Sequence, residues 1–254
     1  SGVPVGVMEQ WPYLPLEQFK DSVYSSGLIS RPFLVQNDCR SYDYHAIAQL
    51  RTYLGRNLMP THVTAQRVMA KLNDFVNQSG EIVTGALDSW ELGTVAFGSA
   101  GALHHQFSYP CKTAPFRSLQ SLRAYSSNGT IFTGRMIDRD NDYEIVDISY
   151  LSGTQTFKLD ILTDRVVQGT SPDSIQALSC RGDLIIWKNP LAQPSHDVLF
   201  TDNEVAMSMH ILRMNDVVQK NLDPLYTIKD AVIDQHIISA IKYACANGGA
   251  VRMS

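Results

Sequence analysis

The hydrophobic residues of this chain change their period twice, and that change constrains the possible fold more than any other feature. Apolar residues recur every three or four positions in residues 41–54 and again in residues 227–247, as they do along the buried face of a helix. Between them, residues 130–162 hold runs rich in β-branched and aromatic residues, separated by polar turns. This order predicts an α+β fold with a mainly antiparallel sheet in the middle of the chain and helices before and after it.

Two helices are predicted ahead of the sheet. The first covers residues 41–54, and Gly55 can close it. The second covers residues 61–78, because apolar residues after Pro60 follow helical spacing. This apolar set consists of Ala65, Val68, Met69, Leu72, Phe75 and Val76. Short strands are expected at residues 81–84, 94–97, 104–109 and 182–187.

A helix is predicted again near the C-terminus. Thr227 and Asp230 have the spacing of a capping box, with Asp in place of the usual Glu or Gln. The sequence Asn247-Gly248-Gly249 can end this helix.

Residues 205–211 fit two structures. Val205, Met207, Met209 and Ile211 alternate with other residues as in a strand, although residues 201–204 resemble the start of a helix. The alternation favours a strand here, followed by a short helix over residues 216–221.

The domain organisation follows from composition along the chain. Residues 1–36 are dense in Pro and Gly and hold several aromatic residues, so we expect an extended N-terminal arm with at most one short helix near residues 16–24. Residues 37–254 are then a single α+β domain, since a chain of 254 residues with 44% hydrophobic content can bury one large core. Arms of this kind often pack on a neighbouring molecule.

Charge and hydropathy exclude some partners. The net charge is −4 and no run of Lys or Arg occurs, so the sequence carries no strong nucleic-acid signal. No apolar run approaches the ~18 residues of a membrane span, which predicts a soluble chain. Only 18% of the residues are charged, while neutral polar residues are plentiful, which favours a surface partly covered by other subunits or by copies of the chain.

Metal and cofactor sites are not expected. The four cysteines, at positions 39, 111, 180 and 245, are far apart and lack zinc spacing. His104 and His105 would point to opposite faces of a strand, so only one of them could serve a given site. Residues 138–142, "DRDND", resemble a calcium loop, but the Gly and Glu of an EF-hand loop are missing and a hairpin turn explains them better.

Cys39 is a candidate nucleophile. It follows a polar turn and would lie near the first turn of the helix that ends at Leu54. The unpaired N–H groups and the dipole of a helix start stabilise a thiolate there and lower its pKa. The alternative is an inert, buried cysteine, which is the common case.

The pair Gln36 and Cys39 resembles the papain-like cysteine peptidases, which open their main helix with the nucleophile and place an oxyanion-hole glutamine shortly before it. The resemblance implies Cys39 as nucleophile and Gln36 in the oxyanion hole. It also requires a histidine base, and Thr130 stands where the family would place it. His104 or His105 would have to supply that base.

Two main hypotheses of function follow. The first is a non-enzymatic structural or assembly protein, such as a viral capsid or other virion subunit, that self-associates through its N-terminal arm and C-terminal helix. It rests on the low charge, the aromatic arm and a start, Ser1-Gly2, that is either a cloning remnant or a processed end. A virion or the host cytoplasm would then be its location. The second is a papain-like cysteine hydrolase that uses Cys39. A ligand-binding module is a third possibility that the sequence does not separate from the first.

Overall fold

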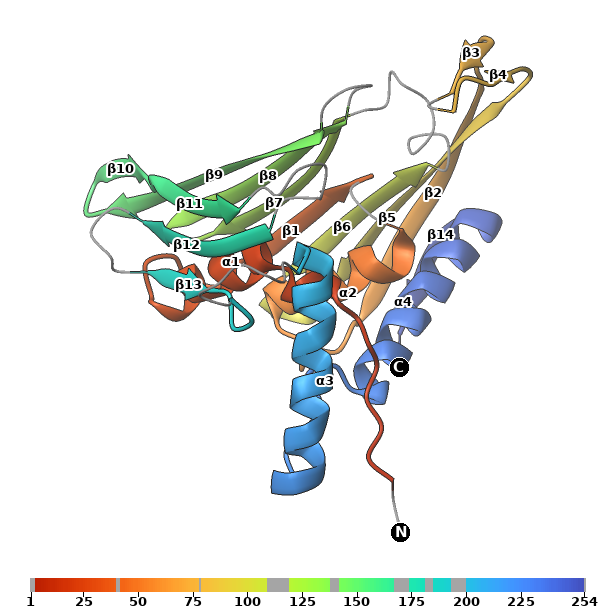
Figure 1. Cartoon of the computed structure of the whole chain (residues 1–254). Coiled ribbons are helices and arrows are strands. Elements are labelled where there is room, and N and C mark those ends of the chain that lie inside the picture. The colour runs from red at the N-terminus through yellow and green to blue at the C-terminus, as the bar shows by residue number, and fades with distance from the viewer. Residues whose placement is uncertain are drawn as a thin grey trace.

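A nine-stranded sheet forms the centre of the computed structural model (Figure 1). The structure describes residues 3–39, 42–77, 79–108, 119–137, 142–166, 174–180, 185–192 and 200–253. From one edge of the sheet to the other, the strands are β10 (Gln155–Lys158), β9 (Asp142–Ser152), β8 (Gly129–Ile137), β7 (Leu119–Ser126), β1 (Leu34–Asp38), β6 (Ala102–Ser108), β5 (Leu87–Ala96), β2 (His62–Lys71) and β14 (Gly249–Arg252).

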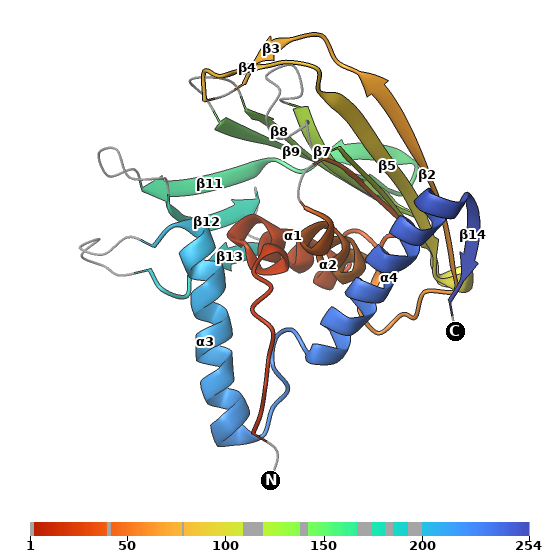
Figure 2. The same ribbon diagram turned by 90° about the vertical axis from the view of Figure 1, so that its right-hand side faces the viewer.

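Helices pack on one face of this sheet, as Figure 2 shows for α1, α2 and α4. None of the helices in the described ranges is long and apolar enough to cross a membrane. The helices are α1 (Pro15–Ser25), α2 (Asp43–Leu54), α3 (Asp202–Lys220) and α4 (Ile228–Asn247), with short 3-10 turns η1 (Trp11–Tyr13) and η2 (Gly98–Ala100). A smaller sheet consists of β11 (Ile161–Val166), β12 (Ser174–Cys180) and β13 (Ile186–Lys188), and a hairpin consists of β3 (Phe75–Val76) and β4 (Ile82–Val83).

The hydrophobic core lies between the main sheet and these helices. Val35 of β1 and Leu103 of β6 are fully buried on the sheet side. Ile47 of α2 and Ile237 of α4 are fully buried on the helix side and belong to the same apolar cluster. Because this core is built on the central strands, those strands are the rigid part of the molecule from which α2 is positioned.

The predicted fold class, a mainly antiparallel sheet in the middle of the chain with helices before and after it, is wrong. The sheet differs from the prediction in which segments form it and in where these segments lie along the chain. The strands come from the whole chain, since β1 precedes α2 and β14 ends the described chain. β1 pairs parallel with β6 and antiparallel with β7, so the sheet is mixed. A local hydrophobic period indicates that a strand exists but does not specify its partner, which is why the sequence did not reveal this arrangement.

The helix predicted over residues 61–78 is also wrong. Residues 62–71 form β2, which pairs along its full length with β5 and at its start with β14. The β-branched residues Val63, Thr64 and Val68 suit a strand, and the helical spacing of apolar residues did not decide the structure. Pairing with two neighbouring strands outweighs the local pattern.

The strand predicted over residues 205–211 lies inside α3. The hydroxyl of Thr201 accepts a hydrogen bond from the backbone N–H of Glu204, and the Glu204 carboxylate accepts one from the backbone N–H of Thr201. This reciprocal cap starts a helix of 19 residues. The alternating apolar residues therefore lie around a helix, where Val205 is fully buried and Ile211 is 62% exposed.

Other predicted elements are confirmed. The helices over residues 16–24 and 41–54 correspond to α1 and α2, and the capping box of Thr227 and Asp230 starts α4. β8, β9 and β10 form the expected antiparallel meander. Residues 138–141 of the calcium-loop motif and Cys111 lie outside the described residues.

The segment before β1 packs within its own molecule. Phe19 and Val23 of α1 are fully buried in the main core. The backbone N–H of Val7 donates to the carbonyl of Tyr226 at 2.9 Å, and the Tyr13 hydroxyl donates to the carbonyl of Leu225 at 2.5 Å. The N-terminal segment thus contacts the residues just before α4. The two elements that were expected to mediate contacts between copies of the chain also contact each other within one molecule.

Candidate functional site

The structure brings the four predicted site residues onto two neighbouring strands. β1 and β6 run parallel, with Gln36 opposite His104 and Asn37 opposite His105. Cys39 follows β1 with a φ of 50°, four residues before α2 begins. It is 1% exposed and packs with Phe107. Cys39 is therefore a buried residue at the end of a strand. α2 begins only at Asp43, so Cys39 does not lie in the first turn of a helix, where the helix dipole was expected to activate it.

His105 is held by two polar side chains. Its Nδ1 accepts a hydrogen bond from the Asn37 amide nitrogen at 3.0 Å, so its Nε2 carries the proton that it donates to Asp43 at 3.1 Å. Lys242 of α4 contacts the other oxygen of Asp43 at 3.1 Å. Burial opposes ionisation of Asp43, yet the hydrogen bonds from His105 and Lys242 hold its pKa below the ordinary value. This network ties β1, β6, α2 and α4 together and leaves neither nitrogen of His105 for catalysis.

His104 points to the other face of the sheet. Its Nδ1 lies 3.0 Å from the hydroxyl of Thr94 on β5. Burial lowers the pKa of His104, and the neighbouring His105 lowers it further. The two histidines therefore serve different surroundings, as expected for a doublet on a strand.

A histidine that the sequence reasoning did not select, His45, pairs with a carboxylate. His45 lies in the first turn of α2, and its Nδ1 is 2.9 Å from each carboxylate oxygen of Glu9. The Glu9 carboxylate also accepts the backbone N–H of Trp11 at 3.1 Å. The side chains of His45 and Glu9 are 13% and 8% exposed. The pair is thus largely shielded from solvent, with a small part of the imidazole exposed.

Aromatic rings flank this pair. The ring of Trp11 lies 5.3 Å from the His45 imidazole, and the ring of Tyr44 lies 4.0 Å from it, measured between centroids. Because a carboxylate only accepts hydrogen bonds, the Nδ1 of His45 carries the proton shared with Glu9. Within the described residues, Nε2 makes no hydrogen bond, so it is the nitrogen that can exchange a proton with a bound molecule.

His210 of α3 supports the backbone at Glu9. Its Nε2 donates to the Glu9 carbonyl at 2.9 Å, and its ring packs edge-on against Tyr13 at 4.8 Å. Burial lowers the pKa of His210, the Glu9 carbonyl and carboxylate oppose that shift, and Arg56 adds to it. Neutral His210 therefore holds the backbone of Glu9 in place through this hydrogen bond.

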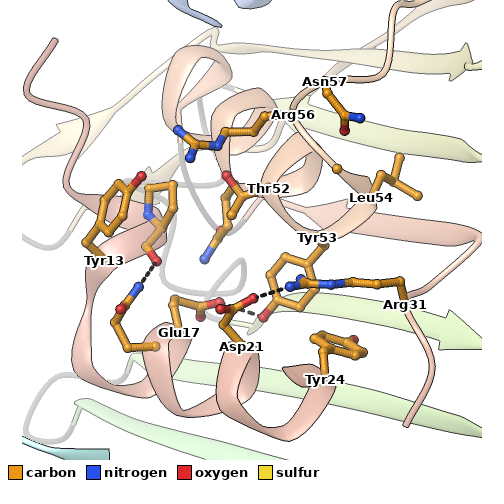
Figure 3. Close-up of a pocket in the computed structure, with 14 residues that line it drawn as sticks. Tyr13, Glu17, Asp21, Tyr24, Arg31, Thr52, Tyr53, Leu54, Arg56 and Asn57 are labelled. Carbon is orange, nitrogen blue, oxygen red and sulfur yellow. Dashed lines mark hydrogen bonds and ion pairs between the residues drawn. The ribbon is translucent and has the colours of Figure 1, made fainter. Parts of the chain in front are cut away.

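A pocket of about 520 Å³ lies further along α2, and neither His45 nor Glu9 belongs to its lining (Figure 3). It lies between α1 and α2, and the first residue of the lining, Pro12, follows Trp11 directly. Gln49 lines it one helical turn after His45, so both side chains lie on the same side of α2. Figure 3 shows Tyr13 and Arg56 toward one end and Tyr24 and Arg31 toward the other.

The acidic groups of the pocket already have partners. Glu17 accepts from the Nζ of Lys20 at 2.7 Å and from the Tyr53 hydroxyl at 2.5 Å. Asp21 pairs with Arg31 at 2.7 Å, and both of these side chains are half exposed at the mouth. The acidic residues therefore leave little unbalanced negative charge for a cation to bind.

Arg56 is held on the other side of the pocket. It donates to the carbonyl of Leu225 and lies 3.6 Å from Asp230. Its guanidinium carbon is 5.2 Å from the ring centroid of Tyr226. This cation is therefore oriented by the N-terminal end of α4.

Gln49 differs from these residues. It is fully buried, and neither the oxygen nor the nitrogen of its side-chain amide has a hydrogen-bond partner in the part of the chain that the structure describes. A buried amide without partners costs free energy, so such a group is uncommon and calls for an explanation.

Sequence reasoning missed Glu9, His45 and Gln49. The signal available was the spacing of His45 and Gln49, four residues apart on a predicted helix. Glu9 lies in the segment interpreted as an arm, and nothing in its neighbourhood indicates a partner 36 residues further along.

A metal centre is not formed by the described residues. They contain no group of three or more His, Cys, Asp or Glu side chains that could hold a metal ion. A dinucleotide is typically held where a parallel strand runs through a glycine-rich turn into a helix. The described turn residues after β1 include no glycine, and the sequence contains no Gly-x-Gly-x-x-Gly. The residues described here therefore do not fit the phosphates of a dinucleotide.

Comparison with known proteins identifies the fold. No protein-family model and no curated protein sequence matches the chain. The solved structure of yvaA from Bacillus subtilis, which is named as an oxidoreductase, matches with a TM-score of 0.59 at 11% identity over 100% of this chain and 67% of its own. A Bacteroides fragilis protein named as an oxidoreductase matches with a TM-score of 0.57 at 12% identity, over 100% of this chain and 65% of its own. An NAD binding oxidoreductase from Klebsiella pneumoniae gives 0.54 at 11% identity over 97% and 65%.

These likenesses show the fold, and the chain spans about two thirds of the length of these structures. They overturn both hypotheses of function drawn from the sequence. The interpretation as a viral capsid or other virion subunit is wrong, and so is the alternative of a papain-like cysteine hydrolase, because the structures that share this fold are oxidoreductases. Low charge and a proline-rich segment occur in many classes of protein, and a cysteine beside a turn is not a specific motif.

Proposed function

We propose that this chain is the substrate-handling part of an oxidoreductase and that His45 transfers the proton of a substrate hydroxyl or carbonyl group. The observation that carries this proposal is the pairing of the His45 Nδ1 with both oxygens of Glu9 at 2.9 Å. The likeness in fold to oxidoreductases over the whole chain supports it.

The chemistry follows from the geometry of the pair. When an alcohol is oxidised to a carbonyl compound, its hydroxyl proton must go to a base. Neutral His45 accepts that proton on Nε2, while Glu9 keeps the proton on Nδ1 and stabilises the imidazolium that forms. In the reverse direction, the imidazolium returns the proton to the carbonyl oxygen. The hydride that leaves the carbon atom would pass to a nicotinamide cofactor, as the NAD binding oxidoreductase of the same fold suggests, and that cofactor's phosphates would be held outside the residues described here.

The surroundings suit a small polar substrate. The rings of Trp11 and Tyr44 both lie against His45, and aromatic rings at such a site pack against the C–H groups of a bound alcohol. The partial exposure of the imidazole leaves room for a hydroxyl group to approach Nε2.

The test compares an alcohol with its ketone. The imidazole signals of His45, identified in NMR spectra by their absence in His45→Gln, should shift when a panel of secondary alcohols, polyols and hydroxy acids is added. The alcohol should bind better than its ketone, because its hydroxyl group can donate to the unprotonated Nε2 of His45, whereas the ketone can only accept a hydrogen bond. In His45→Gln, binding of the alcohol should weaken about tenfold.

A matched control is His104→Gln, which changes a half-buried histidine on β6 that does not contact Glu9. It should bind the same compounds within about twofold of the wild-type protein. If no compound shifts the signals of His45, or if alcohol and ketone bind equally well, the proposed role of His45 is wrong.

We further propose self-association of the chain, on the ground that 18% charged residues leave much of its surface neutral. The N-terminal segment and α4 contact each other within one molecule and still expose apolar residues such as Val5 and Tyr243, which such an interface could use. The mass from light scattering at increasing protein concentration tests this proposal, and a monomer mass throughout would contradict it.

A further inference from the structure

Two residues that line the pocket between α1 and α2, Gln49 and Tyr24, carry buried polar atoms without a hydrogen-bond partner among the described residues, and of these only Gln49 offers a donor group and a separate acceptor group. The Gln49 amide is fully buried, lines the pocket, and has no hydrogen-bond partner for either of its polar atoms among the described residues. A side-chain amide offers a donor and an acceptor side by side, on the same edge of a planar group. A ligand that satisfies it must present the complementary acceptor and donor side by side.

The other polar groups of the pocket narrow the class of ligand. Asp21 and Arg31 neutralise each other at the mouth, and Glu17 accepts from Lys20 and Tyr53. Arg56 is directed to Leu225 and Asp230 outside the lining. With two acidic and two basic residues in the lining, no net charge favours an ion, so a neutral ligand fits best.

The apolar surfaces of the pocket suit a flat ligand. The rings of Tyr13, Tyr24 and Tyr53 belong to the lining, and Figure 3 shows Tyr13 on one side of the pocket with Tyr24 and Tyr53 across from it. Planar faces of this kind stack on aromatic or amide groups. A volume of about 520 Å³ holds a small ring system with its substituents.

We propose that this pocket binds a small neutral cyclic amide, whose adjacent N–H and C=O groups pair with the side-chain amide of Gln49. The two hydrogen bonds satisfy both polar atoms of the Gln49 amide, and the tyrosine rings cover the faces of the ligand. This site goes beyond the proposed oxidoreductase function and does not depend on it.

Uracil is a suitable probe because it is flat, neutral and carries N–H next to C=O. The matched control ligand is 1,3-dimethyluracil, which keeps the ring and both carbonyl groups but has no N–H. Calorimetric titration or saturation-transfer NMR should show uracil binding to the wild-type protein with a dissociation constant of about 1 mM, the range typical of a ligand with so few atoms. 1,3-Dimethyluracil should bind at least about tenfold more weakly.

The matched protein variants are Gln49→Met, which keeps the length of the side chain and removes the amide, and Gln18→Met, which changes a second glutamine of the lining. Gln49→Met should weaken uracil binding at least about tenfold, while Gln18→Met should leave it within about threefold. Equal binding of uracil and 1,3-dimethyluracil, or no binding of uracil at 20-fold its expected ~1 mM constant, overturns the proposal. The comparison of the two ligands needs only the wild-type protein, so it decides the question even if a variant fails to fold.

Discussion

At the scale of single residues, the unpaired amide of Gln49 has a consequence for stability. A buried amide without partners costs free energy, and Met fills nearly the same volume with a similar helix propensity. Gln49→Met should therefore raise the free energy of unfolding of the unliganded protein by about 1–2 kcal/mol. Urea unfolding monitored by circular dichroism measures this change.

The control for this prediction is Gln18→Met. The Gln18 amide nitrogen donates to the carbonyl of Pro12 at 3.1 Å, so its removal should lower the free energy of unfolding by about 0.5–1.5 kcal/mol. The two glutamine variants in this pocket should therefore change the free energy of unfolding in opposite directions. A loss of stability in both would mean that Gln49 has a partner in the folded protein.

His210 should make stability depend on pH. Its pKa in the folded protein is lowered, chiefly by burial, from an ordinary value of 6.5. Above pH 6.5, His210 is neutral in both the folded and the unfolded chain, and its contribution to the free energy of unfolding is fully present. As the pH falls from 6.5 toward the lower pKa of the folded state, the unfolded chain binds a proton at His210 more readily than the folded protein does, and this contribution is lost.

His210→Gln isolates this contribution, because the Gln side chain can still donate to the Glu9 carbonyl but does not titrate. Urea midpoints measured between pH 8 and pH 5 should fall less steeply in this variant than in the wild-type protein. Parallel curves for the two proteins would show that His210 does not titrate differently on folding.

At the scale of elements, a buried ion pair docks α2 on α4. Arg51 is fully buried, and its Nη1 lies 2.5 Å from the Asp234 carboxylate and 3.0 Å from the carbonyl of Asp230. Asp234→Leu should lower the free energy of unfolding by about 3–5 kcal/mol, since it leaves the buried guanidinium with only the longer, 3.7 Å ion pair to the Asp230 carboxylate. The double variant Arg51→Met with Asp234→Leu should be less destabilised than the sum of the single variants, by about 2 kcal/mol in a double-mutant cycle. Additive changes would mean that the pair does not couple the helices.

The elements that the sequence predicted correctly are those specified by local chemistry. The capping box of Thr227 and Asp230 starts α4 because both of its hydrogen bonds form within one helical turn. The segment around Val68 was assigned wrongly because its apolar spacing fits a helix, whereas its structure depends on pairing between β5 and β14. β14 lies almost 180 residues from β2 in the chain, so no local window contains that information.

At the scale of the whole molecule, the candidate site combines segments that a sequence alone does not place together. His45 and Gln49 lie on a helix that the sequence predicts, yet their functional meaning depends on what faces them. Glu9 comes from a segment without regular structure, and its position is set by the Trp11 backbone and by His210 of α3. The sequence therefore predicts the helix that carries His45. It does not predict that the Glu9 carboxylate pairs with His45 and makes it a candidate acid and base.

The architecture predicts a hierarchy of local unfolding. The central strands β1, β6 and β7 carry fully buried residues, among them Val35, Leu103 and Leu122, and helices cover one of their faces. By contrast, the β3–β4 hairpin has two-residue strands, and Ile82 in it is 73% exposed. Amide hydrogens exchange through local openings whose free energy rises with the number of buried contacts, so peptides from the hairpin should exchange within seconds and peptides from β1 and β6 only near the rate of global unfolding. Hydrogen exchange followed by mass spectrometry measures both. If amide hydrogens of the hairpin and of the central strands exchanged at equal rates, the molecule would unfold as one cooperative unit. In that case α2, which carries His45 and Gln49, would unfold only together with the whole sheet.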